Sequence, residues 1–474
     1  MPDLTYRRRR LVLWICCMSL FIVGLDVTIV NVALPSIQRD FHASVSDLQW
    51  TIDMYSLVIA CLLMLSGSMA DRFGRRRVFQ IGLFLFVLGS LLCSLAPGLG
   101  WLVAFRGLQA VGGSMLNPVA ISIIANTFTD PKERGKAMGV WGSVFGLSLA
   151  LGPVLGGLLV SGVGWRSIFW INVPIGVAVI VLTQLFVPES KAAKVRRLDP
   201  FGQALVVIVL GSLTYALIEG PRRGWTSPLI LGLFALTVAG AVALATVELH
   251  RSEPLIDMRF FRSAPFAGAS LIAIFAFFVL GGFLFLNTLY LQDVRHYSAL
   301  QSGLLTLPMA AMLFVFARIS GSIVGSRGPR LPLVIAGVPL LVGAVLLTRL
   351  SLHTSIYYLV AAYLIIGIGC GLVNAPISTT AVAGMPLDQA GVAGAIASTS
   401  RQVGSALGVA VTGSIVAGGL GSAFIASSHL AWAAIAGCGA VVVPLGFLST
   451  GAWARATAER NGERLKERAT QSVS

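Results

Sequence analysis

The 474-residue chain is 56% hydrophobic and only 11% charged, and its mean hydropathy is +0.86. Soluble domains carry about 25% charged residues, so this composition excludes a water-soluble globular protein and indicates a surface that mostly meets lipid. The net charge of +15 would suggest a nucleic-acid partner in a soluble protein. Here the positive-inside rule accounts for it, and we expect no nucleic-acid partner.

Apolar segments long enough to cross a membrane recur along the whole chain. A crossing needs about 20 apolar residues, and the first such segment has no cleavage site after it, so we expect an uncleaved first span. An even number of crossings places both termini on one side, and a cytoplasmic assignment puts most of the 34 basic residues inside. The fourteen expected helices lie at 11–34, 50–70, 78–96, 101–125, 137–160, 166–187, 200–218, 228–248, 265–289, 300–323, 331–349, 356–380, 391–415 and 428–453.

An internal repeat organises these helices. The loop sequence GSMADRFGRR at 67–76 aligns without a gap with GSIVGSRGPR at 321–330, and GGSMLNP at 112–118 has a looser counterpart, GCGLVNAP, at 369–376. Two parallel six-helix bundles with two helices inserted between them fit this register, which is a transporter architecture. The predicted divisions are an N-terminal six-helix bundle at 1–188, a basic linker with two inserted helices at 189–262, a C-terminal six-helix bundle at 263–453 and a solvated cytoplasmic tail at 454–474.

Four motifs in the first five predicted helices resemble the major facilitator superfamily and, within it, the fourteen-span drug:proton antiporters. They are LDVTIVNVALP at 25–35, GSMADRFGRRRVF at 67–79, LVAFRGLQAVGGS at 102–114 and SLALGPVLGG at 148–157. In the second half, STSRQVGSALGVAV at 398–411 resembles a later helix of the same subfamily. The departures from the family pattern are Met69 and Phe79 in place of leucine, and Ala110 and Ser148 in place of glycine.

The resemblance implies the major facilitator fold and a proton-coupled exporter of lipophilic drugs that works by alternating access. It implies no enzyme and no cofactor besides a proton gradient. The expected partners are a small-molecule substrate, protons and membrane lipid, and the expected form is a monomer in a bacterial cell membrane. Export of one endogenous metabolite or antibiotic, and a non-pumping lipid-handling role, remain alternatives, because a fold does not decide a substrate.

Asp26 is the one carboxylate deep within a predicted helix, roughly 22 Å from its inner end. A charged Asp costs at least about 2.5–3.5 kcal/mol in a membrane, so it should face a cavity, be paired or be protonated. Arg106 lies roughly 8 Å from the outer end of its helix, and Asp26 roughly 12 Å from the same face, so the two can meet. Proton coupling through Asp26 and Arg106 is the functional interpretation. A permanent structural pair and a snorkelling arginine are the alternatives.

Other polar residues in the predicted helices are less decisive. Asp53 lies one turn into its helix, where it is either an acid that attracts cations or an inert surface acid. Arg401 lies near a membrane midplane without an acid at its depth in the C-terminal bundle, and its partner is a carbonyl, a lipid or substrate group, or Asp26. The substrate-cavity candidates are Asp26, Asn31, Asp53, Gln109, Asn117 and Arg401. Because acids are so few, we expect monocationic or neutral drugs and poor handling of dications.

Two further motifs suggest conformational roles. The loop after the second helix is interpreted as a conformational switch or, alternatively, as a topology signal; its residues are Gly67, Asp71, Arg72, Gly74, Arg75 and Arg76. The fifth helix is interpreted as a gate against leak or as ordinary small-residue packing; its residues are Gly152, Pro153, Gly156 and Gly157. No nucleotide-binding or hydrolytic motif and no metal-ligand pattern is present, so the energy for transport must come from a gradient.

Overall fold

The computed structural model describes residues 5–191, 199–251, 255–386, 389–418 and 422–471, so the basic residues of the linker within 192–198 lie outside it. Every regular element among the described residues is a helix, which confirms the predicted all-α membrane fold. Thirteen of these helices are long and apolar enough to cross a membrane. The remaining expected crossing, at 391–415, coincides with α14 (Ala390–Val416), which carries more polar and small residues. A total of fourteen crossings is compatible with the structure and stays a prediction.

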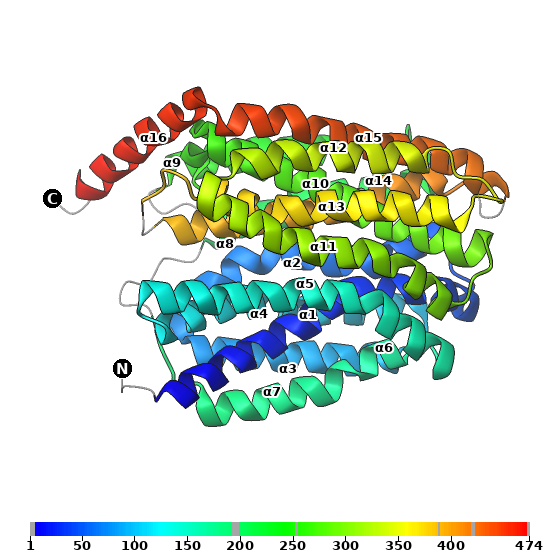
Figure 1. The fold of residues 1–474 in the computed structure, drawn as a ribbon, viewed down its shortest axis with the longest axis horizontal. Coiled ribbons are helices and arrows are strands. Elements are labelled where there is room, and N and C mark those ends of the chain that lie inside the picture. Colours follow the sequence, from blue (N-terminus) through cyan, green and yellow to red (C-terminus); the bar gives the residue numbers. More distant parts are fainter. Residues whose placement is uncertain (1–4, 192–198, 252–254, 387–388, 419–421, 472–474) are drawn as a thin grey trace. The chain divides into compact units, whose positions relative to one another are not determined.

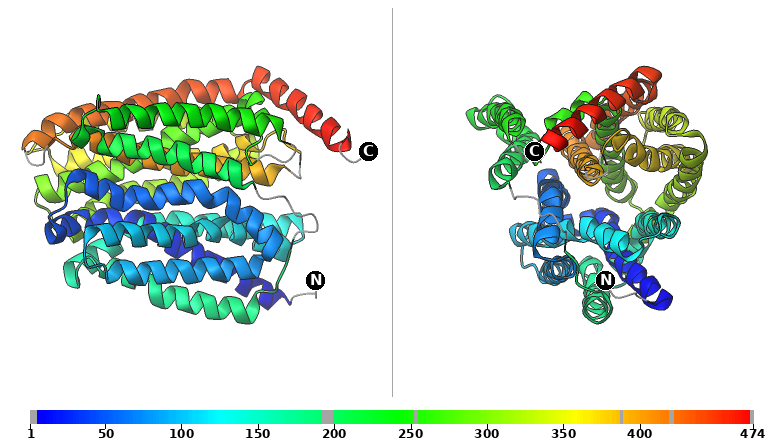
Figure 2. Two further views of the ribbon diagram at one scale, coloured as in Figure 1. Left: turned by 180° about the vertical axis from the view of Figure 1, so that it is seen from behind. Right: turned by 90° about the vertical axis from the view of Figure 1, so that its left-hand side faces the viewer.

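The contacts between helices divide the chain into two units. The N-terminal unit comprises Met1–Leu198 and Thr288–Leu307, and the C-terminal unit comprises Asp199–Asn287 and Pro308–Ser474. Within each unit the helices run alongside one another (Figure 1), and a view from the end shows them nearly along their axes (Figure 2). The four-part division expected from the sequence remains a prediction.

The N-terminal unit is built around α1, which contacts α4, α5 and α7. The helix α2 begins at a capping box, in which the Ser44 hydroxyl accepts from the Asp47 backbone N–H and the Asp47 carboxylate accepts from that of Ser44. The unit's complete helices are α1 (Tyr6–Phe41), α2 (Val45–Phe73), α3 (Arg75–Ser94), α4 (Leu99–Thr127), α5 (Pro131–Gly162), α6 (Ser167–Trp170) and α7 (Asn172–Phe186).

The expected helix at 166–187 is divided into α6 and α7 at Ile171. Pro174 lies in the first turn of α7. A proline has no N–H to give to the carbonyl four residues before it, and it is best tolerated in a first helical turn. The break therefore falls where the proline costs least, and it places Asn172 at the start of α7.

The C-terminal unit contains the inserted helices as well as most of the second bundle. In this unit α8 contacts α9 and α14, and α12 contacts α13 and α15. The elements after α7 are α8 (Pro200–Arg223), α9 (Pro228–His250), η1 (Met258–Arg262), α10 (Ala264–Leu289), η2 (Tyr290–Val294), α11 (Ala299–Arg327), α12 (Arg330–Leu347), α13 (Ile356–Ala381), α14, α15 (Ser422–Thr450) and α16 (Ala452–Gln471). The segment η2 and the beginning of α11 belong to the N-terminal unit.

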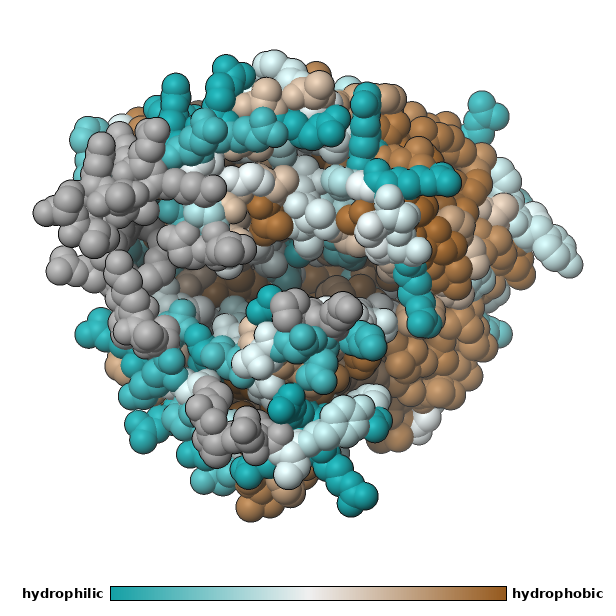
Figure 3. Space-filling model, turned by 60° about the vertical axis from the view of Figure 1, so that its left-hand side comes forward, coloured by the Kyte–Doolittle hydropathy of each residue, from teal (hydrophilic) through white to brown (hydrophobic). Residues whose placement is uncertain are grey.

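Large apolar side chains remain exposed along several of these helices, for example Leu231, Val238 and Val242 of α9. Figure 3 shows hydrophobic residues over a broad part of the surface, while hydrophilic residues gather on the end of the helices that faces the viewer. Apolar sides and polar ends are what a bilayer requires of a helical bundle.

The structure corrects the expectation of a solvated C-terminal tail. The tail forms the helix α16, and Ala458 and Leu465 on one of its faces are buried. Two hydrogen bonds hold it to the C-terminal unit: Asn461 Nδ2 donates to the Arg259 carbonyl at 3.2 Å, and the Ala264 backbone N–H donates to Thr457 Oγ1 at 3.0 Å. The helix is amphipathic, with charged residues on the face opposite the buried one. Because composition alone does not show which residues share a face, it did not predict that this helix packs on the protein.

Candidate functional site

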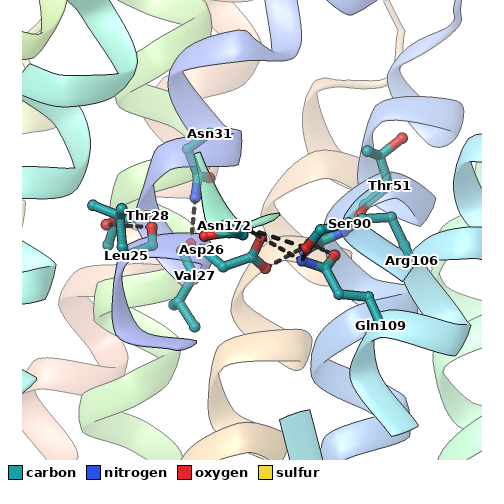
Figure 4. A network of polar contacts seen from close by, with 10 residues as sticks. All are labelled: Leu25, Asp26, Val27, Thr28, Asn31, Thr51, Ser90, Arg106, Gln109 and Asn172. Carbon is teal, nitrogen blue, oxygen red and sulfur yellow. Dashed lines mark hydrogen bonds and ion pairs between the residues drawn. The ribbon is translucent and has the colours of Figure 1, made fainter. Parts of the chain in front are cut away.

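Asp26 lies in the middle of α1 and is completely buried. Its two carboxylate oxygens accept hydrogen bonds from three side chains (Figure 4). Arg106 Nη1 donates to Oδ2 at 2.6 Å, Gln109 Nε2 donates to Oδ1 at 2.9 Å, and Asn172 Nδ2 lies 3.4 Å from Oδ1. An oxygen pair that only accepts is the arrangement that suits an ionised carboxylate.

Arg106 of α4 is 1% exposed, which excludes the snorkelling interpretation. Its Nε donates to the Thr51 carbonyl of α2 at 3.1 Å, and its Nη1 also donates to Gln109 Oε1 at 2.7 Å. The guanidinium carbon lies 4.3 Å from the centroid of the Tyr55 ring, a cation–π distance. Arg106 therefore connects α1, α2 and α4 through charge-assisted hydrogen bonds.

Two members of this network were missed from the sequence. Ser90 of α3 accepts from Gln109 Nε2 at 2.7 Å and lies 3.4 Å from Asn172 Nδ2. Both Ser90 and Asn172 are completely buried. A lone serine within an apolar run carries no signal of its own, whereas an asparagine two residues before a proline indicates the start of a helix.

The packing of α1 against α5 fixes the position of Asp26. A Cβ at Gly24 would lie 2.0 Å from Ser148 Oγ, and a Cβ at Gly152 would lie 1.8 Å from Thr28 Oγ1. Neither position has room for a side chain, so the two backbones approach closely on both sides of Asp26. Glycines of the fifth-helix motif therefore pack directly against the part of α1 that carries the buried acid.

Gly156 also faces α1, where a Cβ would lie 2.9 Å from Ile29 Cγ1, whereas Pro153 and Gly157 face a different neighbour. A Cβ at Gly157 would lie 2.7 Å from the Ala299 carbonyl oxygen at the start of α11, and a Cβ at Gly303 would lie 2.2 Å from the Pro153 carbonyl oxygen. At the same end, Gln292 Nε2 of η2 donates to the Val32 carbonyl of α1 at 2.9 Å. The motif thus packs on α1 with one face and on the first turns of α11 with another, all within the N-terminal unit.

Asp53 is also completely buried, which excludes the inert surface acid. Neither of its carboxylate oxygens has a hydrogen-bond partner among the described residues. Asp53 shares one face of α2 with Gln49 and Ser56, which follow the helical spacing of three and four residues and are buried as well. Its surroundings thus differ from those of Asp26, whose oxygens are fully engaged.

The other cavity candidates of the N-terminal unit lie away from Asp26 along their helices. Asn31 is buried; its Nδ2 donates to the Val27 carbonyl at 3.1 Å, and its Oδ1 has no partner among the described residues. Asn117, two turns beyond Gln109 on α4, is half-buried, and its Oδ1 is likewise unpartnered in the described structure. Of the candidates on these helices, the structure joins only Gln109 to Asp26 and Arg106.

The loop between α2 and α3 contains one ion pair of its own and one missed partner. Arg75 Nη2 donates to Asp71 Oδ1 at 2.9 Å. Gly74 has a φ of +108°, a conformation that favours glycine, and a Cβ there would lie 2.7 Å from Glu189 Oε1. Glu189, which follows α7, accepts from the backbone N–H of Arg76 at 3.0 Å.

This contact places a carboxylate at the N-terminus of α3, where backbone N–H groups are unpaired and the helix dipole is positive. The remaining loop residues have other neighbours: Gly67 lies opposite Pro118 of α4, and the Arg72 guanidinium lies over the Phe73 ring. Glu189 stands in a basic linker, and its role as an acceptor at a distant helix could not be predicted from the sequence.

Arg401 of α14 lies in the C-terminal unit, and its partners differ from those expected. Its Nη2 donates to Ser378 Oγ of α13 at 2.5 Å, and its Nη1 donates to Ser398 Oγ at 3.2 Å. The guanidinium carbon lies 6.0 Å from the centroid of the Phe277 ring of α10. Two hydroxyls and an aromatic ring thus surround this cation, and its Nε is buried without a partner among the described residues.

A model of the family described as Major Facilitator Superfamily matches residues 16–409. The chain belongs to the major facilitator superfamily. It is therefore a membrane transporter rather than an enzyme, as the motifs predicted.

The curated relatives agree with this family. The chain is 38% identical over 400 residues to the multidrug resistance protein Stp of Mycobacterium tuberculosis, covering 84% of this chain and 74% of that protein. It is 36% identical over 410 residues to the tetracenomycin C resistance and export protein of Streptomyces glaucescens, covering 86% and 76%. These bacterial relatives and the many apolar helices place this major facilitator protein in the bacterial cell membrane as a multi-pass protein.

A solved D-xylose-proton symporter shares the fold, with a TM-score of 0.68 over 93% of this chain and 98% of that one. The sequence identity is 16%, so this likeness concerns the fold alone.

Proposed function

We propose that this major facilitator protein is a proton-coupled antiporter that exports lipophilic monocationic or neutral drugs by alternating access. The observation that carries the proposal is Asp26, a fully buried acid in a membrane helix that is held entirely by hydrogen bonds from side chains. Such an acid can exchange a proton without breaking the helix backbone. The resistance and export relatives support the drug as the cargo.

Proton binding would act through the Arg106 network. A proton on Asp26 removes the negative charge that Arg106 and Gln109 face, so the ion pair between α1 and α4 loses its attraction. Loss of the proton restores it. If the inward-open and outward-open states differ in how well they keep this pair, protonation shifts the population between them. A permanent pair would give no such coupling, and this difference is testable.

Further roles in the same proposal rest on location. The Asp71–Arg75 pair and the Glu189 contact lie at the α2–α3 loop, where a change between states can be resisted or released. The α5 glycines lie between α1 and α11, where they can act as a gate against leak. We also propose a functional monomer with both termini in the cytoplasm and a proton gradient as the only energy source.

A relative whose name specifies a single antibiotic, tetracenomycin C, keeps a second candidate open. This candidate is a dedicated exporter of one antibiotic or metabolite that uses the same proton site. A broad panel of drugs separates the two: polyspecific export predicts several unrelated lipophilic substrates, and dedicated export predicts one. A lipid-handling protein without pumping would transport none of them against a gradient.

The deciding experiment uses the purified full chain in proteoliposomes with an imposed pH gradient and a fluorescent lipophilic monocation. We expect the pH gradient to drive accumulation of the cation, and dissipation of the gradient by a protonophore to abolish it. The matched control is Asp40→Asn, which removes a partly exposed acid of the same helix that pairs with Arg166 at 2.8 Å. Accumulation of the cation that does not depend on the pH gradient, or that persists in Asp26→Asn, would contradict proton coupling at Asp26.

A further inference from the structure

Arg401 is a membrane-embedded cation whose hydrogen-bonding capacity is largely unused. A guanidinium carries five N–H donors in a rigid plane, and the hydrogen bonds of Arg401 to two neutral serine hydroxyls occupy two of them. Its Nε is buried and has no partner among the described residues. The remaining donors are therefore available to an acceptor that is absent from the chain's own contacts.

The sequence supplies no acid to neutralise this charge from the surrounding helices. Between residues 264 and 292 there is no Asp or Glu, and between 299 and 450 the only one is Asp388, which lies outside the described residues. The helices whose side chains contact Arg401, namely α10, α13 and α14 itself, carry no carboxylate. The helix α8, which also packs against α14, carries Glu219, and this acid pairs with Arg223 at 3.5 Å. An unneutralised arginine is costly to place in a membrane helix, and charged residues there are commonly functional.

The site is accessible and has one aromatic wall. Arg401 is partly exposed, and Ser378, its partner on α13, is exposed although it lies within a membrane helix. Phe277 of α10 is also partly exposed and lies within cation–π distance of the guanidinium. A planar ligand with an anionic oxygen can therefore meet the free N–H groups with its oxygen and Phe277 with its ring.

We infer that Arg401 binds an anionic or strongly accepting oxygen of the exported drug, such as a carboxylate or an enolate on an aromatic scaffold. The inference rests on the proposed function and extends its substrate class: neutral and anionic aromatic drugs with such an oxygen bind at this site, whereas the proposed monocations gain nothing from it. In the low-dielectric interior of the membrane, a charge-assisted hydrogen bond to a guanidinium is worth about a tenfold or greater gain in affinity.

The test compares two probes with the same ring system, 1-pyrenebutyrate and its methyl ester. Their affinities for the purified full chain are measured by fluorescence in nanodiscs of zwitterionic lipid. In Arg401→Gln we expect the affinity for pyrenebutyrate to fall about tenfold or more, and the affinity for the ester to change by less than about threefold. Arg401→Lys keeps the charge but loses the planar guanidinium, so its affinity for pyrenebutyrate should lie between those of wild type and Arg401→Gln.

The matched control is Arg318→Gln, because Arg318 of α11 is another arginine within a membrane helix of this unit and lies 5.7 Å from the Phe314 ring. It should leave both affinities unchanged. Equal losses for both probes in Arg401→Gln, no loss for pyrenebutyrate, or the same loss in Arg318→Gln would overturn the inference. If Arg401→Gln does not fold, Arg401→Lys must still lose discrimination between the probes, and full discrimination in that variant would overturn the inference.

Anionic lipid is the other source of the same chemistry. The binding measurement is therefore repeated in nanodiscs that contain phosphatidylglycerol, where the inferred drug site predicts unchanged pyrenebutyrate affinity. Loss of this affinity in wild type, but not in Arg401→Gln, would assign the site to lipid and overturn the drug assignment. Proton-driven export of the lipophilic monocation is scored separately, so its failure would contradict the proposed function, whereas intact export without probe discrimination would contradict only this inference.

Discussion

At the scale of single residues, Asp26 and Asp53 of the N-terminal unit are equally buried but differ in their hydrogen-bond partners. Asp26 accepts from Arg106, Gln109 and Asn172, whereas both oxygens of Asp53 lack a partner among the described residues. A buried charge is costly unless it is paired and hydrogen-bonded. The described hydrogen bonds satisfy the buried carboxylate of Asp26, and none of them does so for Asp53.

The first prediction concerns transport by Asp26→Asn. The amide has nearly the same shape, so the protein should insert and fold, but it cannot exchange a proton. We expect proton-driven accumulation to fall to the level of empty liposomes, while Asp40→Asn retains activity close to wild type. Transport rates at equal protein density measure both variants. An Asp26→Asn protein that still builds a drug gradient would assign the proton to another residue.

A second prediction compares the stability of variants in the Asp26–Arg106 pair with that of a variant at Asp53. Arg106→Gln leaves the Asp26 charge buried without its cation, which costs about 3–5 kcal/mol when one partner of a buried pair is removed. The double variant Asp26→Asn with Arg106→Gln removes both charges and should recover most of that loss. Asp53→Asn removes no hydrogen bond among the described residues, so the thermal midpoint of the purified protein should stay close to that of wild type. A midpoint for Asp53→Asn as low as that for Arg106→Gln would reveal a partner of Asp53.

The charged members of the site could be predicted from the sequence, and its neutral members could not. Asp26 and Arg106 stand out because a charge within an apolar run is rare and costly. Ser90 and Asn172 do not stand out, because their role depends on which helix turn faces Asp26. The burial of Asp53 was also hidden, since distance from a helix end does not tell which neighbouring helices cover a side chain.

At the scale of helices, the close packing of α1 against α5 bears on the site, because it lies next to Asp26. The motif glycines predicted close packing, and the structure identifies the partner as the segment of α1 that includes Thr28 and Ile29. The sequence pattern could not identify this partner, because a glycine indicates close packing but not which helix packs against it. The same limit applies to α16. Its many charged residues predicted a solvated tail, although one face of the helix packs on the protein.

A third prediction tests this packing with glycines of the same helix. In Gly152→Ala the new Cβ would lie 1.8 Å from Thr28 Oγ1, so α1 and α5 must separate next to Asp26. We expect a loss of about 1–3 kcal/mol in stability, as for overpacked cores, and slower transport. The control is Gly142→Ala, where nothing lies within 4 Å and the higher helix propensity of alanine should be neutral or favourable.

Thr28→Ala removes the clashing hydroxyl and should partly rescue Gly152→Ala. The measurements are the thermal midpoint and the transport rate of each single variant and of the double variant. Equal effects of Gly152→Ala and Gly142→Ala would show that the close approach is unimportant.

At the scale of the whole molecule, charge and hydropathy determine how the chain sits in a bilayer. The loop between α2 and α3 carries Arg72, Arg75, Arg76 and Arg77, and the chain begins with four arginines within 7–10. The loop between the inserted helices, residues 224–227, is short and contains Trp225, a residue type enriched at membrane interfaces; Arg222 and Arg223 precede it. The fold class follows from such sequence patterns, whereas the membership of η2 and of the first turns of α11 in the N-terminal unit follows only from contacts.

The last prediction concerns topology. With fourteen crossings and cytoplasmic termini, Arg222 at the end of α8 lies outside and Ser472, which is beyond the described residues, lies inside. Single cysteines at these two positions, in a background whose native cysteines are replaced by serine or alanine, are exposed to a membrane-impermeant maleimide on intact cells. We expect labelling at 222 without permeabilisation and at 472 only after it. Thirteen crossings would place the two termini on opposite sides, so labelling of 472 from outside would contradict the fourteenth crossing at α14, and protection of 222 would contradict the orientation itself.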